Sequence, residues 1–524
     1  MMFKKYAFLT LVVAMTTMSC VEDEGNNIIS EINEIEISGL EESYNCISGE
    51  ETLVITPEIK GTLSGADESN LEYEWFLCNK AIDKDHVHEV IGRERNLSYE
   101  VTAAPSNYVL YFSVKDVTTG VKWEASADFN IVSPFVRGFY LFGDKEDGNV
   151  GLDFVSLMAG RDTFVVKDVL NNDLELQGAK DIFFSGSYTS TSSRFWAFTE
   201  SGNYRMECSA AQTNFNLLPE LSDPEKLFFP TVAVTKPYNI VAVQPNSYGS
   251  TNIDCTRSYR LMITENEIFF ASMLSGEAFG NPVNCHTSLG KLYKPSKYVF
   301  YKPGSSVSYY VFYDEENHCF TRMNGSQYAF TYTPKIATSE GAPFYWDQTQ
   351  YEAVRDLVYG QNGVGNAARS YALMKDTNGD YFVYLFTVTH YYDSYITPLA
   401  ARPIDLGIAT DFDQASHYAF YSMQQILLYA VGSKLYAYDY SPERNECKLI
   451  KDFGAEITHL AMDYNSNNDN NHFIVATYDD AEKGVVYGYT IEDDQNAINV
   501  TPVEDEEWHT DLKVVKVEYR NCSY

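Results

Sequence analysis

Hydrophobic and aromatic residues alternate with polar ones in short runs along most of this chain, which is the pattern of β-strands that bury one face. From residue 134 onward these runs come in pairs across short polar turns. The clearest pair spans residues 427–439, where two apolar runs flank Val431, Gly432 and Ser433. Seven such hairpins are predicted, at residues 139–157, 195–208, 260–271, 309–323, 371–386, 427–441 and 473–490. They start about 56 residues apart on average, close to the length of a four-stranded blade with long loops, so residues 134–524 are predicted to form a seven-bladed β-propeller.

Two further segments extend this prediction. The apolar run at residues 512–519 follows the seventh hairpin, and we expect it to close the ring by pairing with strands of the first blade, which removes a free sheet edge. Residues 350–359 carry four apolar side chains at helical spacing and end before Gly360, so we expect a short helix in a loop between two blades.

An earlier part of the chain, residues 33–133, has the pattern of a separate β-domain. Turn signals separate alternating runs at residues 52–56, 71–77 and 108–114. About a hundred residues with short strands at this spacing predict an immunoglobulin-like sandwich. Trp75 is expected in the core between its two sheets, and Trp196 in the core of the later domain. The predicted fold is therefore all-β, a sandwich followed by a propeller.

The first nineteen residues have the pattern of an export signal rather than of a folded element. Lys4 and Lys5 precede an apolar stretch at residues 6–15, which is too short to span a bilayer, and small residues lead from it to Cys20. A cysteine in this place resembles a bacterial lipobox. Residues 1–19 are therefore predicted to be a lipoprotein signal peptide, and Cys20 the lipid-attachment residue; the alternative is an ordinary signal peptide with a chance cysteine.

Residues 20–32 are predicted to be an acidic tether. Glu22, Asp23 and Glu24 resemble the export signal that carries Bacteroidetes lipoproteins to the outer face of the outer membrane. This resemblance implies an outer-membrane lipoprotein exposed at the cell surface. A solvated tether on the periplasmic side is the alternative.

Residues 33–133 also resemble the PKD-like domain of Bacteroidetes lipoproteins. The patterns are Leu71-x-Tyr73-x-Trp75 in one strand and Tyr108-x-Leu110-x-Phe112-x-Val114-x-Asp116 in another. With the lipobox and the long β-domain that follows, the layout is similar to that of the PKD-like lipoprotein family. The resemblance implies an accessory of a TonB-dependent nutrient-uptake system, in which lipoproteins capture glycan or peptide for an outer-membrane receptor. It implies no catalytic residue.

Charge narrows the range of partners. With 38 Lys and Arg against 73 Asp and Glu, the chain has a net charge of −35, and removal of Lys4 and Lys5 with the signal peptide leaves −37. So large an acidic excess opposes binding to nucleic acid or anionic membrane through a basic surface. It also leads us to expect a neutral or cationic ligand, or a partner protein.

Motifs for catalysis or metal binding are scarce. The sequence has no GxSxG elbow, Walker loop or HExxH helix, so no catalytic residue, metal site or cofactor is predicted. The segment Asp83-x-Asp85-His86-x-His88-Glu89 offers metal-ligand types, but a polar loop is the expected interpretation. Asp376-x-Asn378-x-Asp380 imitates a calcium loop and is expected to be a hairpin turn, because Thr387 stands where such a loop needs Glu.

The sequence leaves open whether the cysteines form disulfides. Eight remain after Cys20, none in a CxxC pair, and both disulfides and buried thiols fit this number. Cys46 and Cys78 are a plausible pair because both fall in the sandwich.

The best candidate for ligand contact is an aromatic loop at residues 343–347. Tyr345 and Trp346 lie there outside any strand pattern, where their rings are able to stack on a sugar or peptide. The alternative is that Trp346 packs against the blade. Two classes of function follow: a non-enzymatic binding or accessory lipoprotein, which we expect, and a secreted propeller hydrolase or lyase acting on glycans. Sequence spacing cannot select the carboxylates of such an enzyme, because they come from separate blades.

Overall fold

A computed structural model gives the fold. The structure describes residues 33–62, 68–80, 88–170, 174–185, 194–207, 224–244, 260–271, 278–303, 309–326, 329–364, 369–388, 396–466, 469–492, 494 and 497–521. The chain is divided into two compact units. The first contains most residues before Asn130, and the second contains the residues from Asn130 onward. Within the described ranges the regular structure is β-strands and four short 3-10 helices: η1 (Glu68–Asn70), η3 (Pro224–Leu227), η4 (Gln348–Gln350) and η5 (Phe412–Gln414). The all-β prediction is confirmed.

The first unit is an immunoglobulin-like sandwich. Its strands are β1 (Ile35–Ser38), β2 (Ser43–Ile47), β3 (Thr52–Ile55), β4 (Glu58–Gly61), β5 (Leu71–Asn79), β6 (His88–Gly92), β7 (Leu97–Glu100), β8 (Ser106–Asp116) and β9 (Lys122–Val132). The largest sheet has the order β2-β9-β8-β5-β6, and β1-β4 and β3-β7 form two smaller sheets. Trp75 is fully buried and its ring stacks on Phe112 at 4.2 Å, which confirms it as the core tryptophan.

Cys46 and Cys78 do not form the disulfide that the sequence made plausible. Both are thiols. Cys46 lies on β2 and Cys78 on β5, and two strands of the same sheet, β9 and β8, lie between them. Because neighbouring strands are about 4.8 Å apart, the two cysteines are separated by roughly 14 Å, about twice the largest Cα separation that a disulfide bridges.

The second unit is a β-propeller. Its strands are β10 (Arg137–Asp144), β11 (Val150–Ser156), β12 (Phe164–Val166), β13 (Ala179–Ser185), β14 (Arg194–Thr199), β15 (Asn203–Glu207), β16 (Ile240–Gln244), β17 (Arg260–Thr264), β18 (Ile268–Ala271), β19 (Val311–Asp314), β20 (Cys319–Arg322), β21 (Asn324–Ser326), β22 (Ala329–Tyr332), β23 (Arg355–Asn362), β24 (Ser370–Asp376), β25 (Tyr381–Val388), β26 (Ile396–Pro403), β27 (His417–Tyr421), β28 (Ile426–Val431), β29 (Lys434–Asp439), β30 (Glu446–Asp452), β31 (Glu456–Asp463), β32 (His472–Asp479), β33 (Lys483–Ile491), β34 (Val500–Thr510) and β35 (Lys513–Asn521).

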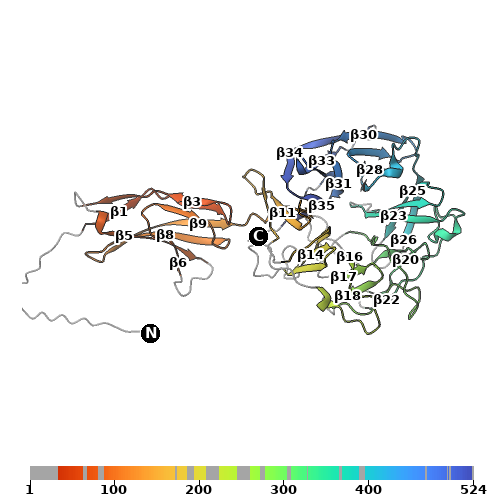
Figure 1. Cartoon of the computed structure of the whole chain (residues 1–524), viewed down its shortest axis with the longest axis horizontal. Helices are drawn as coiled ribbons and strands as arrows, with labels where there is room; N and C mark the ends of the chain where they lie inside the picture. Colours follow the sequence, from red (N-terminus) through yellow and green to blue (C-terminus); the bar gives the residue numbers. More distant parts are fainter. Residues whose placement is uncertain are drawn as a thin grey trace, which may run out of the picture. The chain divides into compact units, whose positions relative to one another are not determined.

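These strands form antiparallel sheets that follow one another around a ring. Figure 1 shows β16, β23, β31 and β35 toward the middle of the ring and β30 and β34 on its outside. The sheets are β12-β11-β10-β35, β13-β14-β15, β16-β17-β18, β19-β20, β21-β22, β23-β24-β25-β26, β27-β28-β29-β30 and β31-β32-β33-β34. That the propeller has seven blades stays a prediction.

All seven predicted hairpins are present. They are β10–β11, β14–β15, β17–β18, β19–β20, β24–β25, β28–β29 and β32–β33. In four of their turns an aspartate Oδ1 accepts the backbone N–H two residues later at 2.8–2.9 Å, namely Asp147, Asp314, Asp376 and Asp479. This Asx turn is the physical reason that an acid followed by polar residues predicts a hairpin. The calcium-like sequence at Asp376 is thus a hairpin turn, as predicted.

The predicted ring closure is also confirmed. β35 pairs antiparallel with β10, the first strand of the unit, so that Tyr519 lies opposite Phe139 and Val517 opposite Leu141. These four side chains join Trp508 of the last sheet in one buried cluster. The chain therefore carries a strand from its end into the sheet of its first hairpin, where β35 covers the edge that β10 would otherwise expose.

The helix predicted at residues 350–359 is wrong. β23 occupies the second half of this segment, residues 355–359, and pairs with β24. Its pairing register shifts between Leu357 and Tyr359, so Leu357 and Val358 fall out of strict alternation. The irregularity gives the apolar residues a spacing that imitates one face of a helix.

Candidate functional site

A cavity of about 660 Å³ opens where the edge strands of the propeller sheets meet. Its wall is formed by β13, β16, β23, β27, β31 and β35, each at the edge of its own sheet, together with residues 297–299. Several of these strands border the middle of the ring (Figure 1), so we call this space the central cavity. Its volume lies within the range of roughly 300 to 1,000 Å³ that is typical of small-molecule sites.

Side-chain amides join neighbouring strands of the cavity wall. Asn362 Nδ2 donates to Val299 O at 2.8 Å, and Asn362 Oδ1 accepts from Tyr301 N at 3.0 Å. Gln361 makes the same double contact with Phe420, donating to its O at 2.7 Å and accepting from its N at 2.8 Å. Because the wall strands belong to different sheets, these amides replace a backbone ladder and fix the width of the cavity.

Tyrosines form one side of the central cavity. Tyr298 and Tyr359 meet edge to face with ring centroids 5.4 Å apart, and Tyr359 lies 5.8 Å from Tyr418. Tyr359 Oη donates to Gln361 Oε1 at 3.0 Å. Burial raises the pKa of Tyr298 to about 12, so its hydroxyl stays neutral. Aromatic faces with hydroxyl groups at their edges suit the apolar face and polar rim of a sugar ring.

Charged side chains of β13 and β35 also line the central cavity. Lys516 of β35 places its Nζ 3.4 Å from Asp181 Oδ1 of β13 and 5.3 Å from the ring centre of Phe183. Burial raises the pKa of Glu518 to about 8, although the Lys516 charge opposes this shift. Burial also raises the pKa of Asp181, against the opposing charges of Lys516 and Lys297. At neutral pH, Glu518 therefore keeps its proton in most molecules.

Two histidines line the central cavity as neutral rings. Burial lowers the pKa of His417 and holds the pKa of His459 well below its usual value. His459 Nε2 accepts from Val517 N at 3.4 Å, which requires an unprotonated nitrogen. Neither ring adds positive charge to the cavity at neutral pH.

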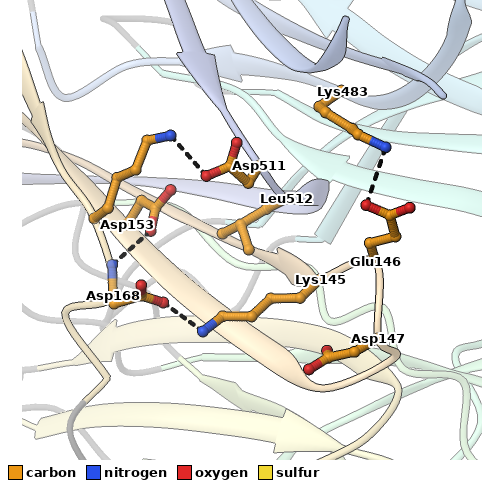
Figure 2. Close-up of a pocket in the computed structure, with 9 residues that line it drawn as sticks. Lys145, Glu146, Asp147, Asp153, Asp168, Lys483, Asp511 and Leu512 are labelled. Atoms are coloured by element: carbon orange, nitrogen blue, oxygen red, sulfur yellow. Dashed lines mark hydrogen bonds and ion pairs between the residues drawn. The ribbon is translucent and has the colours of Figure 1, made fainter. Parts of the chain in front are cut away.

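A second pocket, of about 340 Å³, lies between the first and last sheets (Figure 2). We call it the seam pocket; it is lined by Lys145, Glu146, Asp147, Asp153, Lys167, Asp168, Lys483, Asp511 and Leu512. Each of its lysines meets a carboxylate: Lys145 pairs with Asp168, Lys167 with Asp511 at 2.7 Å, and Lys483 with Glu146 at 3.2 Å. The last two pairs cross the seam, so these charges stabilise the closure of the ring.

The aromatic loop predicted to contact a ligand contains one core residue and one exposed residue. Trp346 is 2% exposed, and its ring packs edge to face at 4.8–5.4 Å against Phe320, Phe344 and Phe386. Because this ring is buried, the prediction that Trp346 contacts a ligand is wrong. A tight turn that points its ring inward has the same sequence pattern as an exposed loop. Tyr345 is 41% exposed and its ring rests on Tyr351 at 5.0 Å. Its ligand contact stays a prediction. Trp196 is buried, as predicted.

His286, Asp314 and Cys319 have the composition of a metal site, with ligand atoms within 4.8 Å of one another. His286 Nε2 lies 3.0 Å from Asp314 Oδ2. The Asp314 carboxylate already accepts the N–H groups of the β19–β20 turn, as the equivalent aspartates of other hairpins do. Burial raises the pKa of the Cys319 thiol to about 12, so without a metal this thiol keeps its proton. We assign this cluster to the packing of its hairpin.

Several predicted residues lie outside the described ranges. They are Cys20, Glu22, Asp23 and Glu24 of the anchor and tether, and Asp83, Asp85 and His86 of the polar loop; His88 and Glu89 begin β6. In the part of the chain that the structure describes, no helix has the length and apolarity needed to cross a membrane.

The sequence analysis missed the residues of the central cavity. Asp181 and Lys516 lie more than three hundred positions apart and meet only because the ring closes. A local signal was present in the closing strand, where Lys516 and Glu518 alternate with Val515, Val517 and Tyr519. Charged residues at alternate positions of an edge strand indicate a face that does not join the core.

Comparison with known proteins gives a family match for the first part of the chain. The model of the PKD-like family matches residues 20–176. No curated protein matches the sequence. Among solved structures, a quinonprotein alcohol dehydrogenase-like protein from Bacteroides thetaiotaomicron is 13% identical, with a TM-score of 0.38 over 92% of this chain and 97% of that chain. The WD40 domain of SCAP from fission yeast is 12% identical, with a TM-score of 0.31 over 63% of this chain and 75% of that chain.

Proposed function

We propose that this protein is a lipoprotein of the outer membrane that binds a glycan or peptide in the central cavity and serves a TonB-dependent nutrient-uptake system without changing its ligand chemically. The observation that carries the binding role is the central cavity, which combines a side of tyrosine rings with a side of charged groups. The membrane location is supported by the sequence around Cys20 and by the match to the PKD-like family.

The construction of the wall favours binding with little rearrangement. Most of the lining side chains come from strands at sheet edges, and Gln361 and Asn362 hold adjacent segments together through hydrogen bonds of 2.7–3.0 Å. A site that is already ordered spends little binding energy on immobilising its own side chains. Such a cavity is suited to capture of a small ligand from dilute solution.

Glycan and peptide arrays on the purified mature lipoprotein in detergent test the binding role. For the ligand found, Tyr359→Ala is expected to weaken binding by about 1 to 3 kcal/mol, the usual range for truncating an aromatic anchor. Tyr345→Ala is the matched control, because it removes an exposed tyrosine outside the cavity lining. If Tyr345→Ala weakens binding and Tyr359→Ala does not, the site is the aromatic loop and not the cavity.

A role in uptake has its own test. Purification of the lipoprotein from gently solubilised outer membranes is expected to bring a TonB-dependent receptor with it. Recovery of the lipoprotein free of any such receptor, under conditions that preserve known receptor complexes, would contradict this part of the proposal.

A glycan hydrolase or lyase is the second candidate, and one observation favours it. Asp181 and Glu518 line the same cavity, and burial raises the pKa of both. A general acid needs a carboxyl group that keeps its proton at neutral pH. A glycoside hydrolase also needs a second carboxylate nearby, which acts as base or nucleophile. Turnover of a glycan that Glu518→Gln abolishes would establish the enzyme and overturn the proposal of binding alone.

A further inference from the structure

The central cavity has a local charge opposite in sign to that of the protein. Lys180, Lys297 and Lys516 line it, against two acids, Asp181 and Glu518. Lys516 already meets Asp181 at 3.4 Å. Glu518 is largely protonated at neutral pH, since burial raises its pKa to about 8. The cavity is therefore cationic in a chain whose net charge is −35.

Two of these lysines differ from those of the seam pocket. Every lysine in the seam pocket contacts a carboxylate (Figure 2). Among the described residues, by contrast, neither Lys180 nor Lys297 has a carboxylate within ion-pair distance. Lys297 instead lies over the Tyr298 ring, 5.3 Å from its centre. Both lysines are exposed, and the Lys297 charge acts on Asp181 without contacting it, so the ammonium groups of Lys180 and Lys297 are accessible to a ligand in the cavity.

The position of the charge explains which ligand class fits. Lys297 is next to the tyrosine side of the cavity, and Lys180 immediately precedes Asp181 on β13. A ligand that stacks on Tyr298 and Tyr359 therefore has ammonium groups within reach at one end. Lysine is a compact charge that binds carboxylates without a fixed fork geometry. A cavity with low-dielectric walls also concentrates the local field, so that a small anion is attracted despite the acidic surface.

We propose that the central cavity binds a short glycan that carries a carboxylate, such as an oligosaccharide of uronic acid, with Lys180 and Lys297 on the carboxylate and the tyrosines against the sugar rings. This inference rests on the proposed binding role of the same cavity. It replaces the neutral or cationic ligand expected from net charge, because the charges that contact a ligand are those of the cavity and not those of the whole chain.

Titration calorimetry with two probes of equal length tests this inference: an oligogalacturonate and the corresponding neutral oligogalactoside. The mature lipoprotein is expected to bind the oligogalacturonate at least tenfold more tightly, and to lose that preference as salt rises from about 50 to about 500 mM, because screening weakens charge contacts. The double variant Lys180→Gln/Lys297→Gln is expected to lose the preference while its affinity for the neutral probe stays the same.

Lys145→Gln/Lys291→Gln is the matched control, because it changes the net charge of the protein equally, and neither lysine lines the central cavity or pairs across the seam. It is expected to keep the preference for the oligogalacturonate. Equal affinity for both probes, combined with weaker binding by Tyr359→Ala, would overturn the carboxylate proposal and leave the binding function standing. Loss of preference in both double variants would show a non-specific charge effect and overturn it too. Binding of acidic peptides but of no glycan would overturn the glycan class, and no binding of any probe would contradict both proposals.

Discussion

His472 gives the sharpest prediction about stability. It lies on β32 with Nδ1 2.8 Å from Asp463 Oδ2, at the end of β31, and Nε2 2.7 Å from Glu506 Oε2 on β34. One imidazole thus joins three strands of the last sheet. Glu506 reaches it across β33 at Gly488, where an added Cβ would lie 1.8 Å from Glu506 Oε2. The glycine is what permits this contact.

The size of the effect follows from the pKa of His472. Burial alone lowers this pKa, but the hydrogen bonds to Asp463 and Glu506 outweigh burial and raise it to about 9. A histidine in the unfolded chain has a pKa of about 6.5, and each pKa unit corresponds to about 1.4 kcal/mol, so the site contributes on the order of 3 kcal/mol. Because the folded state holds the proton more tightly, this stabilisation is complete below about pH 6.5 and is lost as the pH rises toward about 9.

Urea unfolding of wild type and His472→Gln, followed by circular dichroism near pH 6 and above pH 9, measures this contribution. The variant is expected to be less stable by up to about 3 kcal/mol near pH 6, and the difference is expected to shrink at the higher pH. Glu506→Gln is expected to fall between the two proteins, because its amide can accept a hydrogen bond without the charge. His509→Gln, an exposed histidine of the same strand, is the control. Parallel pH dependence of wild type and His472→Gln would refute the reasoning.

Three other predictions concern the core and the membrane anchor. Trp346→Ala is expected to destabilise the propeller by about 3 to 5 kcal/mol, whereas Tyr345→Ala is expected to leave the melting temperature nearly unchanged; a small effect of Trp346→Ala would contradict its core position. Cys20→Ala is expected to release the protein from the membrane fraction, and continued tight association would show another anchor. Replacing Glu22, Asp23 and Glu24 by alanine is expected to hide the lipidated protein from protease added to whole cells, and unchanged cleavage would remove the export role.

Local chemistry explains why so much of the strand pattern was predictable. A hairpin such as β24–β25 needs alternation over a few residues and a turn that an adjacent aspartate stabilises, and both are visible in a short window of sequence. Ring closure was predictable because an apolar strand without a partner requires one. The error at β23 arose where a register shift breaks the alternation that identifies a strand.

Long-range geometry explains why the site was not predictable. Lys180, Lys297 and Lys516 come from three separate strands or loops, and no spacing in the sequence indicates that they share a cavity. Net charge does not indicate the charge of a cavity, because it averages over a surface that a cavity ligand does not contact. Trp346 was misjudged for a related reason, since the direction of a ring in a turn depends on the neighbouring sheets that cover it.

The position of β35 also has a consequence during synthesis. The ribosome releases the chain from its N-terminus onward, yet β35 supplies both the partner of β10 and two of the charged groups of the central cavity, Lys516 and Glu518. A chain interrupted before residue 513 therefore lacks the closed ring and the complete site together. The strand that completes the ring is therefore also the strand that completes the wall of the central cavity, and a truncated chain lacks both.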